Sequence, residues 1–418
     1  MAREYRDSGI EWIGQIPKEW KLAALKQIGT YINGYAFKPE DWTDSGKPII
    51  RIQDLTGSMG SPNFYNGELD SKYLVSKGDI LVSWAATLDA FVWEKNEGWL
   101  NQHIFKALPS SDVNYQFFYW LIKLAMENMN NDNKHGIVMQ HVTTKVFGNF
   151  VVSIPSIDEQ QKIAYYLDKV CGEVDEMVAL QETMIEELKA YKQSVITEAV
   201  TKGLNPNAPM RNSGIDWIGE IPEHWEVRRI GRLFKLRDEK NYKPMEEVQL
   251  LSLYTGIGVF PHGEQEERGN KAVTVEGYKV VHKNDIVVNI ILAWMGAIGV
   301  SDYDGVTSPA YDVYIPDFTK VVPHYFHYVF RTKGIAAECY KYGRGIMMMR
   351  WRTYSSEFKQ ISVPYPSIEE QQQIASYLDA KCSEIDSLIA LKQAKIEELK
   401  EYKKSVIYEY VTGKKEVI

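Results

Sequence analysis

Apolar residues recur at alternating intervals of four and three along two long segments of the chain. This spacing places them on one side of an α-helix and is typical of helices that pack as a coiled coil. Each segment follows a proline and opens with a capping box, Ser156 with Glu159 and Ser367 with Glu370. We predict two helices of about 45 residues, each roughly 65 Å long. Their apolar faces carry Ile163, Leu167, Val170, Val174, Met177, Met184, Leu188, Tyr191 and Val195 in the first, and Ile374, Leu378, Ile385, Leu388, Ile396, Leu399, Tyr402 and Val406 in the second.

One polar residue interrupts each apolar face near its middle, Gln181 in the first helix and Lys392 in the second. A polar residue at a single core position can fix the register of a helix pair at some cost in stability. Two matched helices in one chain pair more easily with each other than with another molecule, although a coiled coil between molecules is an alternative. We therefore expect an antiparallel pair related by a two-fold, with Gln181 and Lys392 close together.

The long helices belong to a repeat of about 200 residues, which is too long for a solenoid unit and indicates two whole domains. Asp7–Trp20, DSGIEWIGQIPKEW, returns as Asn212–Trp225, NSGIDWIGEIPEHW. The offsets between the copies close the sequence into a ring of two units. We expect the two ends of the chain to lie near each other, with Asp7–Trp20 following the second helix as Asn212–Trp225 follows the first.

Two unlike segments, about 21–150 and 226–360, lie between the repeated parts and share only a skeleton of a turn, a buried strand and a short helix. We predict an α+β fold, in which two mixed α/β domains are separated by two long antiparallel helices that form an intramolecular coiled coil. The arrangement is pseudo-two-fold and circular. The predicted regions are a junction segment with the first domain (1–155), a central helix (156–205), a junction segment with the second domain (206–366) and a C-terminal helix (367–418).

The formal net charge of −8 argues against a nucleic-acid partner until the charge is counted by region. Residues 151–225 carry 6 basic and 13 acidic side chains, whereas residues 226–360 carry 19 and 16. Local charge therefore permits a polyanionic partner without demanding one. Three cysteines, no secretory signal and no stretch long enough to span a bilayer lead us to expect a cytoplasmic protein with no membrane partner.

The sequence offers no catalytic signature: it lacks a Walker A motif, HExxH, a CxxC pair and GxSxG. His324 and His327 are spaced like metal ligands on one helix face, but packing or surface roles explain them better. We therefore interpret the chain as a binding protein with no catalytic and no metal site. A coiled-coil adaptor that does not bind DNA, and a self-sufficient methyltransferase or nuclease, are the alternatives.

Side chains suited to phosphate and base contacts gather in two matching stretches and two matching loops. The candidates in the second domain are Lys341, Arg344, Arg350 and Arg352, with Ser308 and Tyr311 in a nearby loop. The candidates in the first domain are Lys134, His135, Gln140, His141 and Lys145, with Asn101, Gln102 and His103 in the equivalent loop. For any single residue among them, an ordinary solvated position is the alternative.

The paired motifs WIGxIPxxW and PSI(D/E)EQQxIAxYLD, each present twice, resemble the specificity (S) subunit of type I restriction–modification systems over essentially the whole chain. The resemblance implies two target-recognition domains, each reading one half of a bipartite, asymmetric site in double-stranded DNA. It implies that the helices set the gap between the halves and dock two methyltransferase (M) subunits. S-adenosylmethionine would act in those subunits, ATP and Mg in up to two restriction (R) subunits, and no cofactor in this chain. The family has no transferable base-by-base code.

Overall fold

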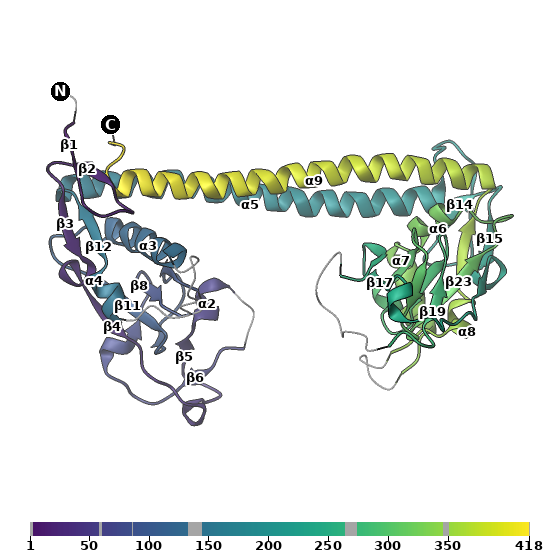
Figure 1. Ribbon diagram of the computed structural model, residues 1–418, viewed down its shortest axis with the longest axis horizontal. Helices are drawn as coiled ribbons and strands as arrows, with labels where there is room; N and C mark the ends of the chain where they lie inside the picture. Colours follow the sequence, from purple (N-terminus) through teal and green to yellow (C-terminus); the bar gives the residue numbers. More distant parts are fainter. Residues whose placement is uncertain are drawn as a thin grey trace. The chain divides into compact units, whose positions relative to one another are not determined.

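The computed structural model describes residues 3–57, 61–85, 87–132, 144–263, 274–345 and 351–417 (Figure 1). The chain divides into two compact units. Unit 1 consists of Met1–Glu182 and Ala394–Ile418, and unit 2 consists of Thr183–Gln393. Each unit contains part of both long helices. This division differs from that of the four predicted regions, whose limits stay a prediction.

The two long helices are α5 (Ile157–Lys202) and α9 (Ile368–Val411). In unit 1, Lys403 Nζ lies 2.6 Å from Asp175 Oδ2, and the rings of Tyr166 and Tyr410 are 4.4 Å apart. Residue numbers rise along α5 as they fall along α9, so the helices are antiparallel here.

The same antiparallel pairing holds in unit 2. Lys192 Nζ lies 2.6 Å from Asp386 Oδ2, and Lys392 Nζ lies 3.3 Å from Met184 Sδ. The predicted α+β fold with a packed antiparallel helix pair is confirmed.

The predicted apolar face is wrong near the middle of α5. Met177, Met184 and Tyr191 are 44%, 36% and 56% exposed, whereas Ile185 is 5% exposed. An α-helix has 3.6 residues per turn and drifts away from a strict seven-residue repeat, so the buried stripe moves by one residue. In α9, Leu388 and Tyr402 are likewise 42% and 51% exposed, whereas the predicted Ile396 is buried at 1%.

The two domains outside the long helices contain central sheets with the same strand order. The sheet of unit 1 has the order β4-β11-β8-β9 and that of unit 2 the order β16-β23-β20-β21, with antiparallel neighbours throughout. The unit 1 strands are β4 (Gly29–Asn33), β11 (Ile104–Pro109), β8 (Ile80–Ser83) and β9 (Asp89–Val92). The unit 2 strands are β16 (Phe234–Leu236), β23 (Tyr311–Pro316), β20 (Ile286–Asn289) and β21 (Ile298–Val300).

Shorter elements complete each unit. In unit 1 they are β1 (Tyr5–Asp7), β2 (Gln15–Pro17), β3 (Lys21–Ala24), α1 (Leu25–Ile28), β5 (Lys47–Ile50), α2 (Ile52–Thr56), β6 (Phe64–Tyr65), β7 (Leu74–Val75), β10 (Gly98–Leu100), α3 (Tyr115–Asp132), α4 (Thr144–Asn149) and β12 (Val151–Ile154). In unit 2 they are β13 (Met210–Asn212), β14 (Glu220–Pro222), β15 (Glu226–Arg229), β17 (Leu251–Tyr254), β18 (Gly258–Pro261), β19 (Lys279–Val281), β22 (Gly305–Thr307), α6 (Pro323–Val329), α7 (Lys333–Tyr342), α8 (Ser355–Phe358) and β24 (Ser362–Tyr365).

In each unit the long helices and the domain share one hydrophobic core. The unit 1 core joins Ile163 and Leu167 of α5 to Phe117 and Phe118 of α3. The unit 2 core joins Ile374 and Leu378 of α9 to Tyr325 and Phe326 of α6. Separating a helix from its domain would expose these side chains, each of which contributes about 1.5–3 kcal/mol by burial.

The first glutamine of each Glu-Gln-Gln motif fastens the start of a long helix to its domain. The side chain of Gln160 accepts a hydrogen bond from the Asn114 backbone N–H at 2.7 Å and donates to the Pro155 carbonyl at 3.1 Å. Gln371 accepts from the Val322 N–H at 2.8 Å and donates to the carbonyl of Pro366 at 3.1 Å. Both glutamines are buried, so the backbone groups they bind are shielded from water.

The preceding glutamate of each motif holds the last tryptophan of the junction segment. Trp20 Nε1 donates to Glu159 at 2.9 Å, and Trp225 Nε1 donates to Glu370 at 3.0 Å. Both indole rings are buried. The repeated motif therefore has the same structural use in both copies.

The expected closure of the ring is confirmed within unit 1. Lys414 Nζ donates to the backbone carbonyls of Ile13 and Gln15. Gly413, with φ of 75°, packs against Pro17 and Trp20, as Gly203, with φ of 74°, packs against Trp225. Figure 1 shows β1 and β2 near the last turns of α9.

We predict that Gln371→Ala lowers the free energy of unfolding of unit 2 by about 1–3 kcal/mol, because it leaves the partly buried Val322 N–H without its acceptor. Urea denaturation followed by circular dichroism measures the change. Gln372→Ala is the matched control, because its side chain is exposed one position further along the same helix. Equal effects of the two substitutions would contradict the assigned role.

Candidate nucleic-acid interface

Two of the predicted contact regions meet at the end of β20 in unit 2. The Ile290 N–H, just after β20, donates to the Ala310 carbonyl at 3.3 Å, and the Ile290 carbonyl accepts from the Thr353 N–H at 2.8 Å. The loop that contains Ser308 therefore lies next to the segment that contains Arg352. These stretches are 44 residues apart in the sequence, and the backbone of one residue joins them.

The basic segment is closed into a hairpin by its own backbone. Arg344 and Arg352 face each other as an antiparallel pair, with N–H···O distances of 2.9 and 3.0 Å. Thr353 is buried, and its hydroxyl donates to the Cys339 carbonyl at 2.9 Å. Both ends of the hairpin are thus fixed to the domain. Arg350 lies between them, in the stretch 346–350, which is outside the described residues.

Arg344 presents an oriented guanidinium at the surface. Its Nη2 lies 2.6 Å from Glu357 Oε1, and its Cζ lies 5.5 Å from the ring centre of Tyr354. The Arg344 side chain is nevertheless exposed. A planar guanidinium held in this way can offer its remaining N–H groups to a phosphate or to a guanine edge. Lys341, on the last turn of α7, pairs instead with Glu338 at 3.4 Å.

A row of aromatic rings supports the hairpin, and the sequence did not single these rings out. Trp351 stacks on Tyr340 at 5.2 Å with an interplanar angle of 24°, and Tyr340 lies 6.0 Å from Trp294. Trp351 Nε1 also donates to the Tyr340 carbonyl at 3.1 Å. Gly343 was the one feature of the sequence that pointed to this close packing, because a residue without a side chain lets the chain fold back closely after α7.

Tyr311 is the first residue of β23, and Ser308 lies in the loop just before it. The Ser308 hydroxyl accepts a weak bond from the Ala310 N–H at 3.4 Å. Burial raises the pKa of Tyr311, so its hydroxyl stays neutral at physiological pH. Tyr311 pairs with Asn289 across the sheet and is a packing residue as much as a surface one.

The equivalent loop of unit 1 also precedes the second strand of its central sheet. The Gln102 N–H donates to the Tyr35 carbonyl at 3.0 Å, and the His103 N–H donates to Asn101 Oδ1 at 3.3 Å. The His103 ring is exposed and lies 5.6 Å from Trp84. The structure therefore places the two predicted loops at the same position in two matching sheets.

Among the remaining unit 1 candidates, Lys145 lies on α4 with an exposed side chain. Lys134, His135, Gln140 and His141 lie outside the described residues. None of these placements tests a contact with DNA, so the candidate residues stay predictions.

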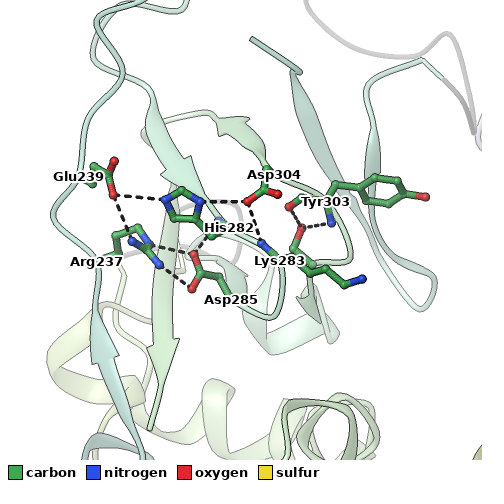
Figure 2. Close-up of polar contacts among 8 residues, drawn as sticks. Arg237, Glu239, His282, Lys283, Asp285, Tyr303 and Asp304 are labelled. Atoms are coloured by element: carbon green, nitrogen blue, oxygen red, sulfur yellow. Dashed lines mark hydrogen bonds and ion pairs between the residues drawn. The ribbon is translucent and has the colours of Figure 1, made fainter. Parts of the chain in front are cut away.

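A separate polar cluster lies at the other end of β20, where Asp285 precedes the strand (Figure 2). Arg237 forms a bidentate pair with Asp285 at 2.8 and 2.9 Å and also contacts Glu239 at 3.1 Å. His282 lies between Glu239 at 3.6 Å and Asp304 at 3.0 Å. These groups satisfy one another around the turn at residue 284, which supports a structural role for the cluster.

The histidine pair on α6 also has a packing role. His324 Nε2 lies 2.7 Å from Asp379 Oδ1 on α9 and its ring stacks on His327 at 5.5 Å. Burial lowers the pKa of His327 to about 3, so this ring is neutral. In the part of the chain that the structure describes, no group of three or more potential ligand side chains could hold a metal ion.

The family model of the type I restriction modification DNA specificity domain matches residues 17–190 and 222–401. The chain belongs to this family. It supplies DNA specificity to a type I restriction–modification system and is itself non-catalytic, since methylation and cleavage reside in M and R subunits.

Relatives of known function cover almost the whole chain. The type I restriction enzyme EcoBI specificity subunit of Escherichia coli is 24% identical over 93% of this chain and 84% of the relative. The MjaVIII specificity subunit of Methanocaldococcus jannaschii is 22% identical over 96% and 94%. A solved structure described as "Structural basis underlying complex assembly and conformational transition of the type I R-M system" shares the fold, with a TM-score of 0.66 and 13% identity over 95% and 98% of the two chains.

Across the described ranges, no helix combines the length and the apolar character that crossing a lipid bilayer requires.

We predict that Gly343→Ala weakens DNA binding by disturbing the basic hairpin. A Cβ at this position would lie 2.4 Å from Trp351 Nε1 and 2.8 Å from the Cys339 carbonyl, so the Trp351 ring must move. Because Trp351 adjoins Arg352, the pairing of Arg352 with Arg344 is displaced as well. Tryptophan fluorescence and DNA affinity of the assembled complex report the change.

Gly172→Ala is the matched control for this substitution. Nothing lies within 4 Å of a Cβ at Gly172, in the first half of α5. Alanine there favours the helix by about 1 kcal/mol. An affinity for DNA that stays unchanged in Gly343→Ala would show that the hairpin does not take part in binding.

Proposed function

We propose that each domain reads one half of a bipartite, asymmetric site in double-stranded DNA. The observation that carries this proposal is the pairing of one scaffold with unlike loops. The two central sheets have the same strand order, and the helix starts are fastened by the same Glu-Gln pair. The segments at the strand ends differ, with Asn-Gln-His in one domain and Ser-Pro-Ala-Tyr in the other. Equivalent scaffolds with different surface loops suit two different sequences.

The candidate contacts of the second domain are Lys341, Arg344, Arg350, Arg352, Ser308 and Tyr311. Arg344 and Arg352 have the strongest support, because the hairpin fixes their backbones and guanidinium groups recognise both guanine edges and phosphates. The candidate contacts of the first domain are Asn101, Gln102, His103, Lys134, His135, Gln140, His141 and Lys145. Of the described ones, His103 and Lys145 are exposed.

The long helices are proposed to set the gap between the half-sites and to dock two M subunits. Residues 151–225 carry 13 acidic and 6 basic side chains, so this part of the chain is a poor ligand for DNA. Leu180 and Leu391 are 56% and 68% exposed on the same helices. Exposed leucines on acidic helices favour contact with a protein partner.

In this proposal the cofactors belong to the partners. The M subunits use S-adenosylmethionine, and up to two R subunits use ATP and Mg. This chain binds none of them and acts on DNA in the cytoplasm. Membership of the specificity-subunit family supports the proposal, because the family works as part of a complex with M and R subunits.

We predict that exchanging residues 226–360 for the matching segment of another specificity subunit changes one half of the methylated sequence and leaves the other half intact. The reason is that the second domain's sheet and loops lie within this segment, whereas the first domain is untouched. Methylome sequencing of a strain that carries the complex measures both halves. Exchange of residues 21–150 is the matched control and should change the opposite half. A change in both halves on either exchange would contradict the modular proposal.

The register of the helix pair is proposed to depend on Gln181 and Lys392. The two positions are equivalent in the helical repeat, with an offset of 211 residues, and each lies near the centre of its helix. In an antiparallel pair with a two-fold the centres of the helices meet, so we expect the two side chains to lie close together. Each is partly buried. Gln181 belongs to unit 1 and Lys392 to unit 2, so their proximity stays a prediction.

We expect the double variant Gln181→Cys, Lys392→Cys to form an intramolecular disulfide on mild oxidation, detected as a faster band in non-reducing electrophoresis. The native Cys171, Cys339 and Cys382 are buried and do not compete. Glu173→Cys with Lys392→Cys is the control, because eight residues of helix, about 12 Å, separate position 173 from position 181. Equal cross-linking of both pairs, or of neither, would refute the register.

A further inference from the structure

Unit 2 contains a cavity of about 430 Å³ between the long helices and the loops of the second domain. Lys189 and Lys192 of α5 form one side, and Arg331 and Lys333, around the start of α7, form another. Asp386 of α9 is the one carboxylate in the lining that the structure gives for this cavity. The cavity thus has three more cationic than anionic side chains.

The carboxylate is already used by one of the lysines. Both oxygens of Asp386 accept from Lys192 Nζ, at 2.7 and 2.6 Å. Lys189 pairs with Glu186 at 2.8 Å, but both side chains are exposed, so water screens this pair. Lys333 is exposed and makes no ion pair with any described residue. Of the four cations, Arg331 and Lys333 therefore form no ion pair with a described carboxylate.

Arg331 is partly buried. Its Nη2 donates to the Ile257 carbonyl, and its own carbonyl accepts from Gln193 Nε2 at 3.4 Å. Arg331 Nε is buried and has no hydrogen-bond partner among the described residues. Burial lowers the pKa of Arg331. A largely desolvated cation that forms no ion pair is costly, and an anion bound in the cavity would offset that cost.

Unit 1 can be compared with unit 2 at the same place. The long-helix positions are equivalent in the two units, but the domain surface that faces them differs. The Lys192–Asp386 pair has its equivalent in Lys403–Asp175, also at 2.6 Å. Where α5 has Gln193, however, α9 has Lys404, which contacts Glu401 at 2.7 Å and Glu127 of α3 at 3.7 Å. The first domain thus presents the carboxylate of Glu127 to the neighbouring long helix, whereas the second domain presents the cations Arg331 and Lys333. The cationic excess is a feature of unit 2.

The cavity lies close to the proposed DNA-reading loops. Met295 forms part of its wall, and five residues earlier Ile290 joins the Ser308 loop to the Arg352 segment. Five residues span at most about 18 Å. Each DNA strand carries one phosphate per roughly 3.4 Å of helix axis, so the cavity lies within about five base pairs of those loops.

The geometry points to a binding site for a phosphate group of the DNA backbone, next to the half-site that the second domain reads. This inference rests on the proposed function. Arg331 and Lys333 supply the charge from the domain, Lys189 supplies it from the long helix, and the N-terminal end of α7 adds its dipole. Such a contact positions the duplex against the helix pair and carries no sequence information.

The test measures DNA affinity of the full chain assembled with its M subunits over a range of salt concentrations. The double variant Lys189→Gln, Lys333→Gln should lower the slope of log K against log salt by about 1, because one phosphate contact is lost. The methylated sequence should stay the same. Lys400→Gln, the equivalent of Lys189 in unit 1, is the matched control and should leave the slope unchanged. Lys189 and Lys333 are exposed, so the fold should persist, and the conservative single variant Lys333→Arg should keep the wild-type slope.

A second measurement locates the contact. DNA carrying one uncharged methylphosphonate at successive positions beside the second half-site should bind the wild-type complex more weakly at one position. The double variant should lose that sensitivity. A free phosphate is the other source of the same chemistry, and titration of inorganic phosphate into the full chain distinguishes it.

Three outcomes would overturn the inference. One is an unchanged salt slope with intact sequence specificity, which leaves the proposed function standing. Another is loss of assembly with the M subunits, which would mean that the cavity binds a carboxylate of the partner protein and not a DNA phosphate. The third is inorganic phosphate binding abolished by the double variant with no effect on DNA. If the wild-type complex shows no sequence-specific binding at all, the proposed function itself fails.

Discussion

The structure depends on how a long helix is fixed to a globular domain at its first turn. A glutamate and the following glutamine provide this fixation in both copies. Glu159 and Glu370 hold the indole N–H of a buried tryptophan, while Gln160 and Gln371 satisfy backbone groups where a domain helix begins. Since buried polar groups need partners, these bonds define one direction of approach. The apolar core then continues from the domain into the helix pair.

Because these bonds fix each domain to its long helix, the loops at the distal ends of the sheets can vary in sequence. In unit 2 the Ile290 backbone gathers three segments that are distant in sequence, and the Trp351–Tyr340 stack supports the basic hairpin. Unit 1 presents a different set, with His103 against Trp84. The domains also differ where they face the helices, since one offers Glu127 and the other Arg331 and Lys333. The two units therefore share their fold but differ in electrostatic character.

The sequence predicted the long helices, their capping serines and the ring closure, because these features depend on local patterns that occur twice. It placed Met177 and Met184 in the buried stripe, where the structure has Ile185, because a seven-residue repeat only approximates the helical period. The junction of Ile290 with Ala310 and Thr353 could not be predicted, since it joins residues 20 and 63 positions away. The cationic cavity was missed for the same reason, because its lysines and its arginine come from separate elements.

Unit 1 is assembled from both ends of the chain, whereas unit 2 is one continuous stretch. A ribosome delivers residues 1–182 long before the closing segment, Ala394–Ile418. During translation the N-terminal junction lacks the partner that Lys414 and Gly413 provide, while unit 2 is already complete in sequence at residue 393. The domain that is made first is thus completed after unit 2, and part of its core remains uncovered until Ala394–Ile418 has been made. During synthesis, the N-terminal half is therefore the part of the chain most exposed to chaperones and proteases.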